Sequence, residues 1–527
     1  MLLLRDEVSG WMINVNLQTL SSIGCKRFLT HTGKLVNKLM INFDDCLKIQ
    51  DLATNTIDLI NKLIFQPHKA YTTSSDGKTY FEFGARIGHQ LHLIDRKIKN
   101  KKYIWKPFRK IQVRAKLNKV RDIYLSCWED KIVEGWLNDC LNRLLHEWFS
   151  KNSYAYRIED LGLDSCQARM EKTIKRNRYF IKRDVTKFFY SIDHQIILAQ
   201  LAELIDPNDY LYELITARIR CEYLDTDKTI KKPVIGIPFG SAIACTLSNI
   251  HLTALDKDMV KFRIEYFRYA DDILIMGDDP DEVIRAGEYF DNEIAKLKLA
   301  LKPSAKQNIS FVEHPKFTKV TKFKHLGLEF SCEGVVRFAV EKQRKIINFF
   351  KRELNKRKYM IRKEKNLDRK IGIAIDGVNM MITNRIRCAA IVDYYLKHVN
   401  DELQLKNIDR LIAELVISTV LDKPFRQKDF RIIPFKKLRK MGLTSLLHRS
   451  RLHRHDHLKV SFLSLHNELV FRRYEELRIR RRDRIDHMRM SRKIRGTKIR
   501  HERLIHDQKQ ASSPTEHNLE NRNMKSL

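Results

Sequence analysis

The chain has 527 residues and carries 100 Lys and Arg against 65 Asp and Glu, a formal net charge of +35. Hydrophobic residues make up 43% of it, which excludes a disordered chain and allows several subdomains with buried cores. The positive charge exceeds what solubility needs and predicts a polyanionic partner, most simply nucleic acid. An anionic membrane surface is disfavoured because the basic residues run along the whole length rather than beside one amphipathic anchor.

The nine cysteines form no C-x-x-C pair, so we expect no zinc ribbon, and their scattered, unpaired distribution suits a reducing cytosol. The apolar run Leu2–Leu4 is too short for the core of a signal peptide. No stretch approaches the roughly 18 apolar residues of a membrane-spanning helix, so no membrane association is expected.

The N-terminal region, residues 1–95, carries apolar residues at helical spacing and is predicted to be a mainly helical extension. Within it, the polar stretch Thr72–Lys78 indicates a turn. Tyr80–Phe83 is predicted as a short strand after that turn.

A basic region begins at Arg96 and leads to Lys119–Tyr124, which is predicted as a strand. Alternation along a strand puts Lys119 and Arg121 on one face. Two cations so placed would suit a triphosphate, while a solvated strand face explains the local pattern equally well. Trp128–Phe149 follows as an amphipathic helix.

The next predicted strand, Tyr179–Val185, is apolar and carries Asp184 near its end. Ser191 or Asp193 is expected to cap the helix after it. Gly236–Ser241 is a loop punctuated by Gly and Pro, which would let the backbone approach a ligand closely. A plain entry into the following helix is the simpler explanation of that loop.

Two adjacent aspartates, Asp271 and Asp272, lie between two apolar, strand-like runs. A tight hairpin can hold both carboxylates at its tip while its flanks are buried. Such an acid pair is costly without a compensating cation, and Mg²⁺ is the obvious one because it prefers carboxylate and phosphate oxygens. From this stretch alone, a solvated Asp-Asp turn is as good an interpretation as a metal site.

Beyond the hairpin, we expect a helix over Asp281–Leu297, a turn and strand with Lys306, and a small hairpin strand at Lys324–Phe330. Residues 340–460 are predicted to be helical. Residues 471–500 hold thirteen Lys or Arg against four acids, which indicates contacts with nucleic-acid phosphates, or else a solvated charged helix.

Taken in chain order, these pieces resemble the fingers and palm of a reverse transcriptase over roughly residues 100–335. Six motifs in the correct order carry the resemblance. In chain order they are the finger cations Lys119 and Arg121, Asp184 with Phe189 five residues later, Gly236-x-Pro238-x-Gly240-Ser241 with Ser248-Asn249, the catalytic box Tyr269-Ala270-Asp271-Asp272, Lys306, and His325-Leu326-Gly327. Ser153-Tyr154-Ala155-Tyr156-Arg157 is similar to a motif of group II intron-type and bacterial members.

The resemblance implies an α+β right-hand polymerase fold, with fingers, a palm on an antiparallel sheet, a helical thumb, and helical extensions at both ends. The domains expected from it are a helical extension over 1–95, fingers and palm over 96–335, a thumb and C-terminal helical region over 336–465, a basic RNA-binding segment over 466–507 and a disordered tail over 508–527.

The resemblance also implies an RNA-directed DNA polymerase that adds deoxynucleotides by phosphoryl transfer with two Mg²⁺ ions, for which Mn²⁺ could substitute. The expected catalytic residues are Asp184, Asp271 and Asp272, the last in a secondary role. The implied metal-binding set is Asp184, Val185, Asp271 and Asp272; the nucleotide-binding set is Lys119, Arg121, Phe189, Gly240 and Lys306; the primer grip is His325, Leu326 and Gly327.

Phe189 carries the prediction of a DNA product, because an aromatic ring beneath the sugar would clash with a 2′ hydroxyl. Viral RNA-dependent RNA polymerases share this palm but carry a second acid where this chain has Phe188 and Phe189. The family's usual glutamine in the Gly-Pro loop is Phe239 here, which puts ordinary template use in doubt.

The chain shows no H-N-H nuclease or retron thumb motif, and it resembles the bacterial unknown-group, defence-associated reverse transcriptases. That resemblance implies antiviral defence, with a noncoding RNA as template or scaffold, dNTPs as substrates and DNA as product. The residues expected to contact the RNA are Arg472, Arg473, Arg480, Arg481 and Arg482. Homo-oligomerisation, a retron or group II intron-derived enzyme, and a non-catalytic RNA-binding scaffold stay open as alternatives.

Overall fold

The computed structural model of the chain describes residues 25–29, 35–49, 73–116, 119–158, 161–383, 396 and 398–455. The chain divides into two compact units, residues 1–450 and 451–527. Of the second unit, only residues 451–455 are described, and they form the end of a helix.

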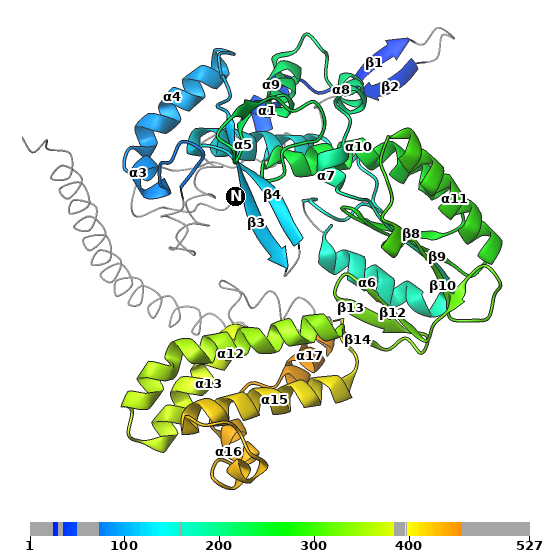
Figure 1. Cartoon of the computed structure of the whole chain (residues 1–527). Coiled ribbons are helices and arrows are strands. Elements are labelled where there is room, and N and C mark those ends of the chain that lie inside the picture. Colours follow the sequence, from blue (N-terminus) through cyan, green and yellow to red (C-terminus); the bar gives the residue numbers. More distant parts are fainter. Residues whose placement is uncertain are drawn as a thin grey trace, which may run out of the picture. The chain divides into compact units, whose positions relative to one another are not determined.

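A five-stranded sheet lies in the right-hand part of the first unit in the view of Figure 1. Its strands are β5 (Tyr179–Asp184), β8 (Glu265–Tyr269), β9 (Asp272–Gly277), β10 (Gln307–Ser310) and β11 (Thr318–Lys319). The spatial order is β11-β10-β5-β9-β8, and every pair is antiparallel except β10 with β11. This is the antiparallel palm sheet that we expected.

The two faces of this sheet bury different cores, as the period-2 alternation of strands requires. Ile181, Ile273 and Ile275 point into a core shared with α10 (Ile243–Asp258) and α11 (Pro280–Lys296). A Cβ at Gly287 of α11 would lie 2.4 Å from Ile181 Cδ1, so the missing side chain allows α11 to approach the sheet closely.

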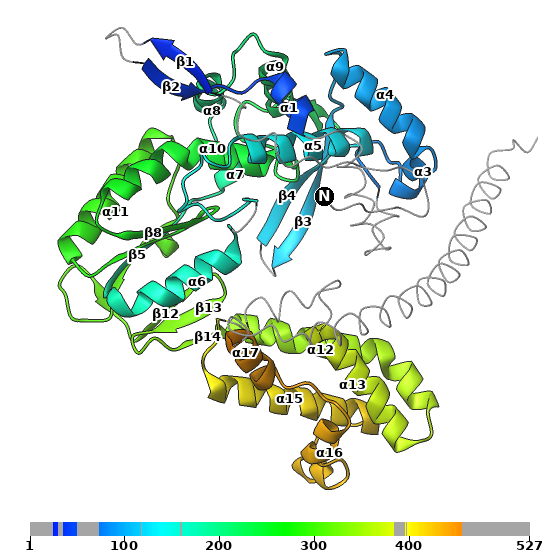
Figure 2. The same ribbon diagram turned by 180° about the vertical axis from the view of Figure 1, so that it is seen from behind.

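The opposite face of the sheet shares a core with α6 (Leu163–Thr173) and a three-stranded sheet, and this core continues into the C-terminal helices (Figure 2). The small sheet consists of β12 (Lys322–His325), β13 (Leu328–Ser331) and β14 (Val336–Phe338). The helices are α12 (Val340–Lys363), α13 (Leu367–Thr383), α15 (Glu402–Leu421), α16 (Phe435–Lys440) and α17 (Leu446–His455). They form the expected helical thumb.

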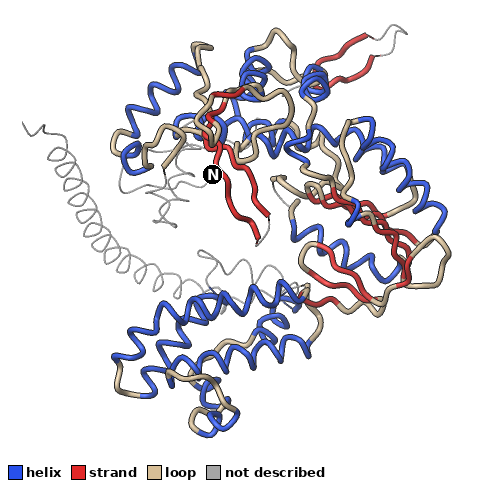
Figure 3. The backbone as a smooth tube through the Cα atoms, in the orientation of Figure 1, coloured by secondary structure: helices blue, strands red, loops and turns tan. Residues whose placement is uncertain are grey.

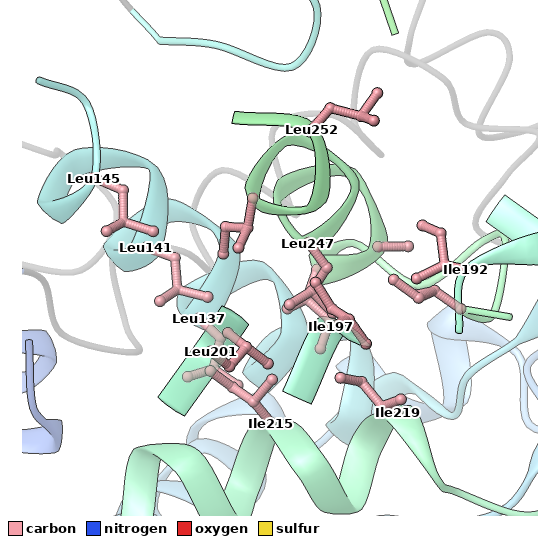
Figure 4. Close-up of a cluster of buried hydrophobic side chains, with 14 of the residues drawn as sticks. Leu137, Leu141, Leu145, Ile192, Ile197, Leu201, Ile215, Ile219, Leu247 and Leu252 are labelled. Carbon is pink, nitrogen blue, oxygen red and sulfur yellow. The ribbon is translucent and has the colours of Figure 1, made fainter. Parts of the chain in front are cut away.

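The fingers combine a second sheet with a group of helices (Figure 3). The strands are β3 (Phe108–Lys116), β4 (Lys119–Leu125), β6 (Tyr223–Leu224) and β7 (Ile230–Lys231), and the helices are α5 (Trp128–Leu144), α7 (Phe188–Ser191), α8 (His194–Ala202) and α9 (Tyr210–Ile219). Side chains such as Leu137, Ile197, Ile215 and Leu247 fill the core between these helices and α10 (Figure 4). As predicted, Asp193 caps α8, accepting hydrogen bonds from the backbone of Gln195 and Ile196.

The N-terminal part departs from its sequence-based prediction in two ways. It contains the hairpin β1 (Cys25–Leu29) and β2 (Leu35–Leu39) in addition to α1 (Phe43–Ile49), α3 (Tyr80–Gly84) and α4 (Ile87–Lys99). The strand predicted at Tyr80–Phe83 is wrong, since these residues form α3. Thr79 and Glu82 make a reciprocal capping box that starts a helix, and Tyr80 and Phe83 bury one helical face.

No helix within the described ranges is both long and apolar enough to cross a membrane.

A buried ion pair joins the β8–β9 hairpin to α10. Arg268 and Asp256 are both fully buried, with the Arg268 Nε and Nη2 atoms 2.8 and 2.6 Å from the two carboxylate oxygens. Arg268 also donates to Asn249 and Ser153, and Tyr266 donates to Asp256. Every charge is therefore paired in a low-dielectric interior, where an unpaired charge would be costly.

Removing one partner of this pair should destabilise the fold strongly. Replacing Arg268 with Met would leave the Asp256 carboxylate buried and unpaired, at a cost of about 3–5 kcal/mol, so thermal unfolding of the full chain should begin several degrees lower. A matched control is Arg410→Met, which breaks an exposed pair with Glu414 and should change the melting temperature little. Equal melting temperatures for the two variants would contradict this prediction.

A second polar contact links the thumb to α6. His398 is buried, with Nε2 2.8 Å from Asp164 Oδ1 and Nδ1 3.4 Å from Glu171 Oε2. Burial lowers the pKa of His398, but the two carboxylates outweigh it and raise the pKa above the ordinary value. Both ring nitrogens can donate only in the protonated imidazolium.

The stability supplied by His398 should therefore depend on pH. A raised folded pKa means that the contribution is complete below the unfolded pKa, about 6.5, and is lost as the pH rises through the folded value. His398→Gln should lower the melting temperature more at pH 6 than at pH 9. His89→Gln, at an exposed position, is the control and should show no such difference; a pH-independent loss for His398→Gln would refute the charge-based account.

Candidate active site

Three carboxylates meet at one end of the palm sheet. Asp184 ends β5 and lies directly across the ladder from Asp272, the first residue of β9. Asp271 lies in the two-residue turn between β8 and β9, and its carbonyl accepts a hydrogen bond from the Val185 amide at 3.2 Å. The sheet register therefore brings together acids that are more than eighty residues apart in sequence.

The turn that carries Asp271 is held in an unusual backbone conformation. Ala270 has φ of 57°, in the left-handed region, which costs a non-glycine residue about 1–2 kcal/mol. Arg268 Nη1 donates to the Ala270 carbonyl at 3.3 Å. The buried ion pair of Arg268 with Asp256 is thus connected directly to the turn that positions Asp271.

The three carboxylates have different electrostatic surroundings. Burial, followed by the negative charges of Asp184 and Asp272, raises the pKa of Asp271. Burial also acts to raise the pKa of Asp272, but the nearby His325 outweighs it and the pKa is lowered. His325 Nδ1 lies 3.4 Å from Asp272 Oδ1, and Lys302 Nζ lies 3.8 Å from Asp184 Oδ2.

These residues fit a divalent cation that is completed by substrate. The raised pKa of Asp271 marks negative charge that its protein neighbours do not offset, and carboxylate oxygens are ligands that Mg²⁺ prefers. Val185 can offer only its backbone carbonyl, because its side chain is apolar and buried. Within the described residues, no group of three or more His, Cys, Asp or Glu side chains could hold an ion, so phosphate oxygens would have to complete the shell.

The fingers bring one predicted cation toward the acids. Arg121 lies on β4, as expected, and its charge counteracts the rise in the pKa of Asp271. Its side chain is exposed, which leaves it accessible to an anion. Lys119 begins the same strand, but its side chain lies outside the described residues.

Aromatic side chains pack together around Phe189, and one of them, Tyr156, has Asp271 among its charged neighbours. Phe189 lies in α7 and is buried, with ring centroids 5.2 Å from Phe239 and 6.3 Å from Tyr156. The Ile237 amide donates to the Phe189 carbonyl at 2.7 Å, which ties the Gly-Pro loop to α7. A Cβ at Gly240 would lie 2.6 Å from the Tyr124 carbonyl, so only glycine lets the loop run this close to β4.

The predicted late palm lysine contacts a different acid. Lys306 Nζ lies 2.8 Å from Asp291 of α11, a carboxylate that also pairs with Arg183. Lys302, four residues earlier, is the lysine beside Asp184, and its amide donates to the Asp184 carbonyl at 2.8 Å. Sequence reasoning missed Lys302 because the turn that brings it back to β5 leaves no local signal.

The remaining predicted residues are those of the primer grip and the arginines expected to contact RNA. His325 ends β12, and Leu326 and Gly327 form the left-handed turn to β13, so these three residues lie on a hairpin near Asp272, and their role as a primer grip stays a prediction. Lys182 is a residue that we did not predict; its position two residues before Asp184 places both side chains on one face of β5 and could have indicated it. The residues expected to contact RNA, Arg472, Arg473, Arg480, Arg481 and Arg482, lie outside the described part of the chain.

The motif from Ser153 to Arg157 is hydrogen-bonded to α10 and to β8, the strand that leads into the Asp271 turn. Asn249 of α10 donates to the Ala155 carbonyl at 2.9 Å, and the Tyr154 amide donates to the Arg268 carbonyl at 2.9 Å. Arg157 donates to the carbonyls of Ser150 and His146. Motifs that are separate in sequence thus form one hydrogen-bonded layer beneath the hairpin.

Comparison with known proteins agrees with this geometry. Residues 100–330 match the family model "Reverse transcriptase (RNA-dependent DNA polymerase)". The putative COX1/OXI3 intron 1 protein of Saccharomyces cerevisiae is 26% identical over 29% of this chain and 18% of its own length, and the intron 2 protein is 25% identical over 33% and 20%. Protein YkfC of Escherichia coli is 22% identical over 36% of this chain and 50% of its own length.

The matched region covers only part of these relatives, about a fifth of each intron protein. Among solved structures, telomerase from Candida albicans aligns over 65% of this chain and 64% of its own, with 11% identity and a TM-score of 0.37. Apo telomerase from Candida tropicalis aligns over 67% and 63%, with 11% identity and a TM-score of 0.39. Residues 100–330, with their α+β fold, are thus similar to the reverse transcriptase family and to parts of the intron proteins.

Proposed function

We propose that the protein is an RNA-directed DNA polymerase. The observation that carries the proposal is the meeting of Asp184 and Asp271, from separate parts of the palm, within the matched reverse transcriptase domain. Arg121 acts on Asp271, where a triphosphate would be needed, and Phe189 packs on Tyr156, whose neighbours include Asp271. The large positive charge supports a nucleic-acid template as the partner.

In the proposed reaction, Asp184 and Asp271 would hold two Mg²⁺ ions; the chemistry that such ions would supply when bound is activation of a 3′ hydroxyl and stabilisation of charge on the phosphoryl group. Arg121 binds the triphosphate through paired N–H donors. Asp272, turned toward His325, supports the geometry of the turn rather than the ions directly. Phe189 excludes the 2′ hydroxyl, so deoxynucleotides are chosen and the product is DNA.

For the biological setting, we propose antiviral defence with a noncoding RNA as template or scaffold. The specific match to intron proteins supports a second candidate, a reverse transcriptase of a mobile element. One experiment separates them: purify the protein with its bound nucleic acid, supply dNTPs, and sequence both the RNA and the DNA made. A short noncoding RNA that is copied repeatedly would favour antiviral defence, whereas an intron-like RNA would favour the mobile element.

Asp271→Asn should abolish primer extension while leaving RNA binding intact, since it removes one negative charge from the proposed metal site. We expect a loss of about 10²–10³-fold in kcat/KM, measured by primer extension with Mg²⁺. The control is Asp278→Asn. It alters an exposed aspartate that pairs with Arg178 and directly follows the opposite end of β9. Retained primer extension in Asp271→Asn would contradict the proposed role of Asp271, whereas retained function of the same variant in vivo would favour the non-catalytic scaffold.

Phe189→Ala should admit ribonucleotides, because removing the ring opens space for the 2′ hydroxyl. We expect the ratio of kcat/KM for rNTP to that for dNTP to rise by about 10–100-fold, a range typical of discrimination by shape. The measurement is single-nucleotide extension with each triphosphate. An unaltered ratio would show that Phe189 does not set sugar selectivity.

A further inference from the structure

The Gly-Pro loop places an aromatic ring directly against Phe189. The ring of Phe239 lies 5.2 Å from Phe189 at an interplanar angle of 51°, and 6.3 Å from Tyr190. Tyr156 contacts Phe189 as well, with its ring nearly perpendicular at 65°. Phe189 therefore has ring neighbours from two other segments of the chain, and these contacts restrict how its ring can turn.

The backbone of Phe239 is held independently of its ring. Its carbonyl accepts a hydrogen bond from the Tyr124 amide at 2.9 Å, and the Ser241 amide donates to the Pro238 carbonyl at 3.1 Å. Gly236 and Gly240 have φ of 85° and 120°, and both pass too close to neighbouring carbonyls to carry a Cβ. The loop should therefore keep its path when the ring of Phe239 is replaced.

The chemistry of Phe239 limits what it can do at this position. A phenyl ring donates no hydrogen bond, so it cannot recognise a base edge or a sugar hydroxyl through one. Aromatic packing is its main contribution, and an offset or tilted ring pair favours one relative orientation. The residue it packs on is the proposed barrier to the 2′ hydroxyl.

We propose that Phe239 is a positioning residue that sets sugar selectivity by holding the ring of Phe189 in place. This inference rests on the proposed polymerase function and on the role of Phe189 within it. The substrates that it separates are deoxyribonucleoside and ribonucleoside triphosphates. Phe239 acts through Phe189, without touching the nucleotide itself.

The test is Phe239→Leu, which keeps an apolar side chain but removes the ring. We expect the rNTP-to-dNTP ratio of kcat/KM to rise by about two- to tenfold, in proportion to one aromatic pair, while kcat/KM for dNTP stays close to wild type. Phe239→Tyr keeps the ring and should retain wild-type selectivity. It also serves as the readout if Phe239→Leu fails to fold, because a changed ratio in Phe239→Tyr would overturn the proposal.

A double-mutant cycle distinguishes action through Phe189 from a separate effect. In the Phe189→Ala background, Phe239→Leu should change the ratio no further, because the ring that it positions is gone. Additive effects would overturn the proposal. The matched control is Phe425→Leu, which breaks a thumb ring pair at 5.1 Å and should leave selectivity unchanged.

The two proposals fail in different ways. A wild-type protein that extends no primer with any dNTP would contradict the polymerase function and this inference with it. A wild-type protein that makes DNA, with a Phe239→Leu variant of unchanged selectivity, would contradict this inference alone.

Discussion

The buried pair of Arg268 and Asp256 is the constraint on which the site depends. It lies in the interior with no solvent to screen it, so its attraction is strong and its loss costly. Through one guanidinium it connects β8, α10, the segment at Ser153 and the Ala270 carbonyl. The strained turn that presents Asp271 is therefore fixed by the same side chain that joins the palm to its supporting helix.

The two faces of the palm sheet pack against different elements. On one face, isoleucines pack against α10 and α11, where glycine at position 287 permits a close approach. On the other face, phenylalanines such as Phe180 and Phe267 share a core with α6, the small sheet and the thumb. Because both faces are covered, the acids can be exposed only at the end of the sheet, where β5 stops and the hairpin turns.

The candidate site combines positive charges with a group of aromatic rings, which would serve the proposed binding of a triphosphate and selection of its sugar. Arg121, Lys302 and Lys182 provide positive charge around the three carboxylates, whereas burial, joined by the charges of Asp184 and Asp272, raises the pKa of Asp271. Phe189, Phe239 and Tyr156 form the aromatic group. A polymerase needs both the charges and the rings. Phosphates are recognised by charge, whereas ribose and deoxyribose differ by only one hydroxyl.

Local sequence patterns alone identified the Asp271-Asp272 hairpin, the strand ending at Asp184 and the Gly-Pro loop, because strand alternation and turn chemistry are properties of neighbouring residues. The same patterns failed at Tyr80–Phe83, where the Thr79–Glu82 capping box outweighed strand propensity. Only the tertiary structure decided that Lys302 rather than Lys306 lies beside Asp184, and that Phe239 packs on Phe189. Those contacts depend on how distant segments are brought together by the sheet register and the buried ion pair, and no local pattern records them.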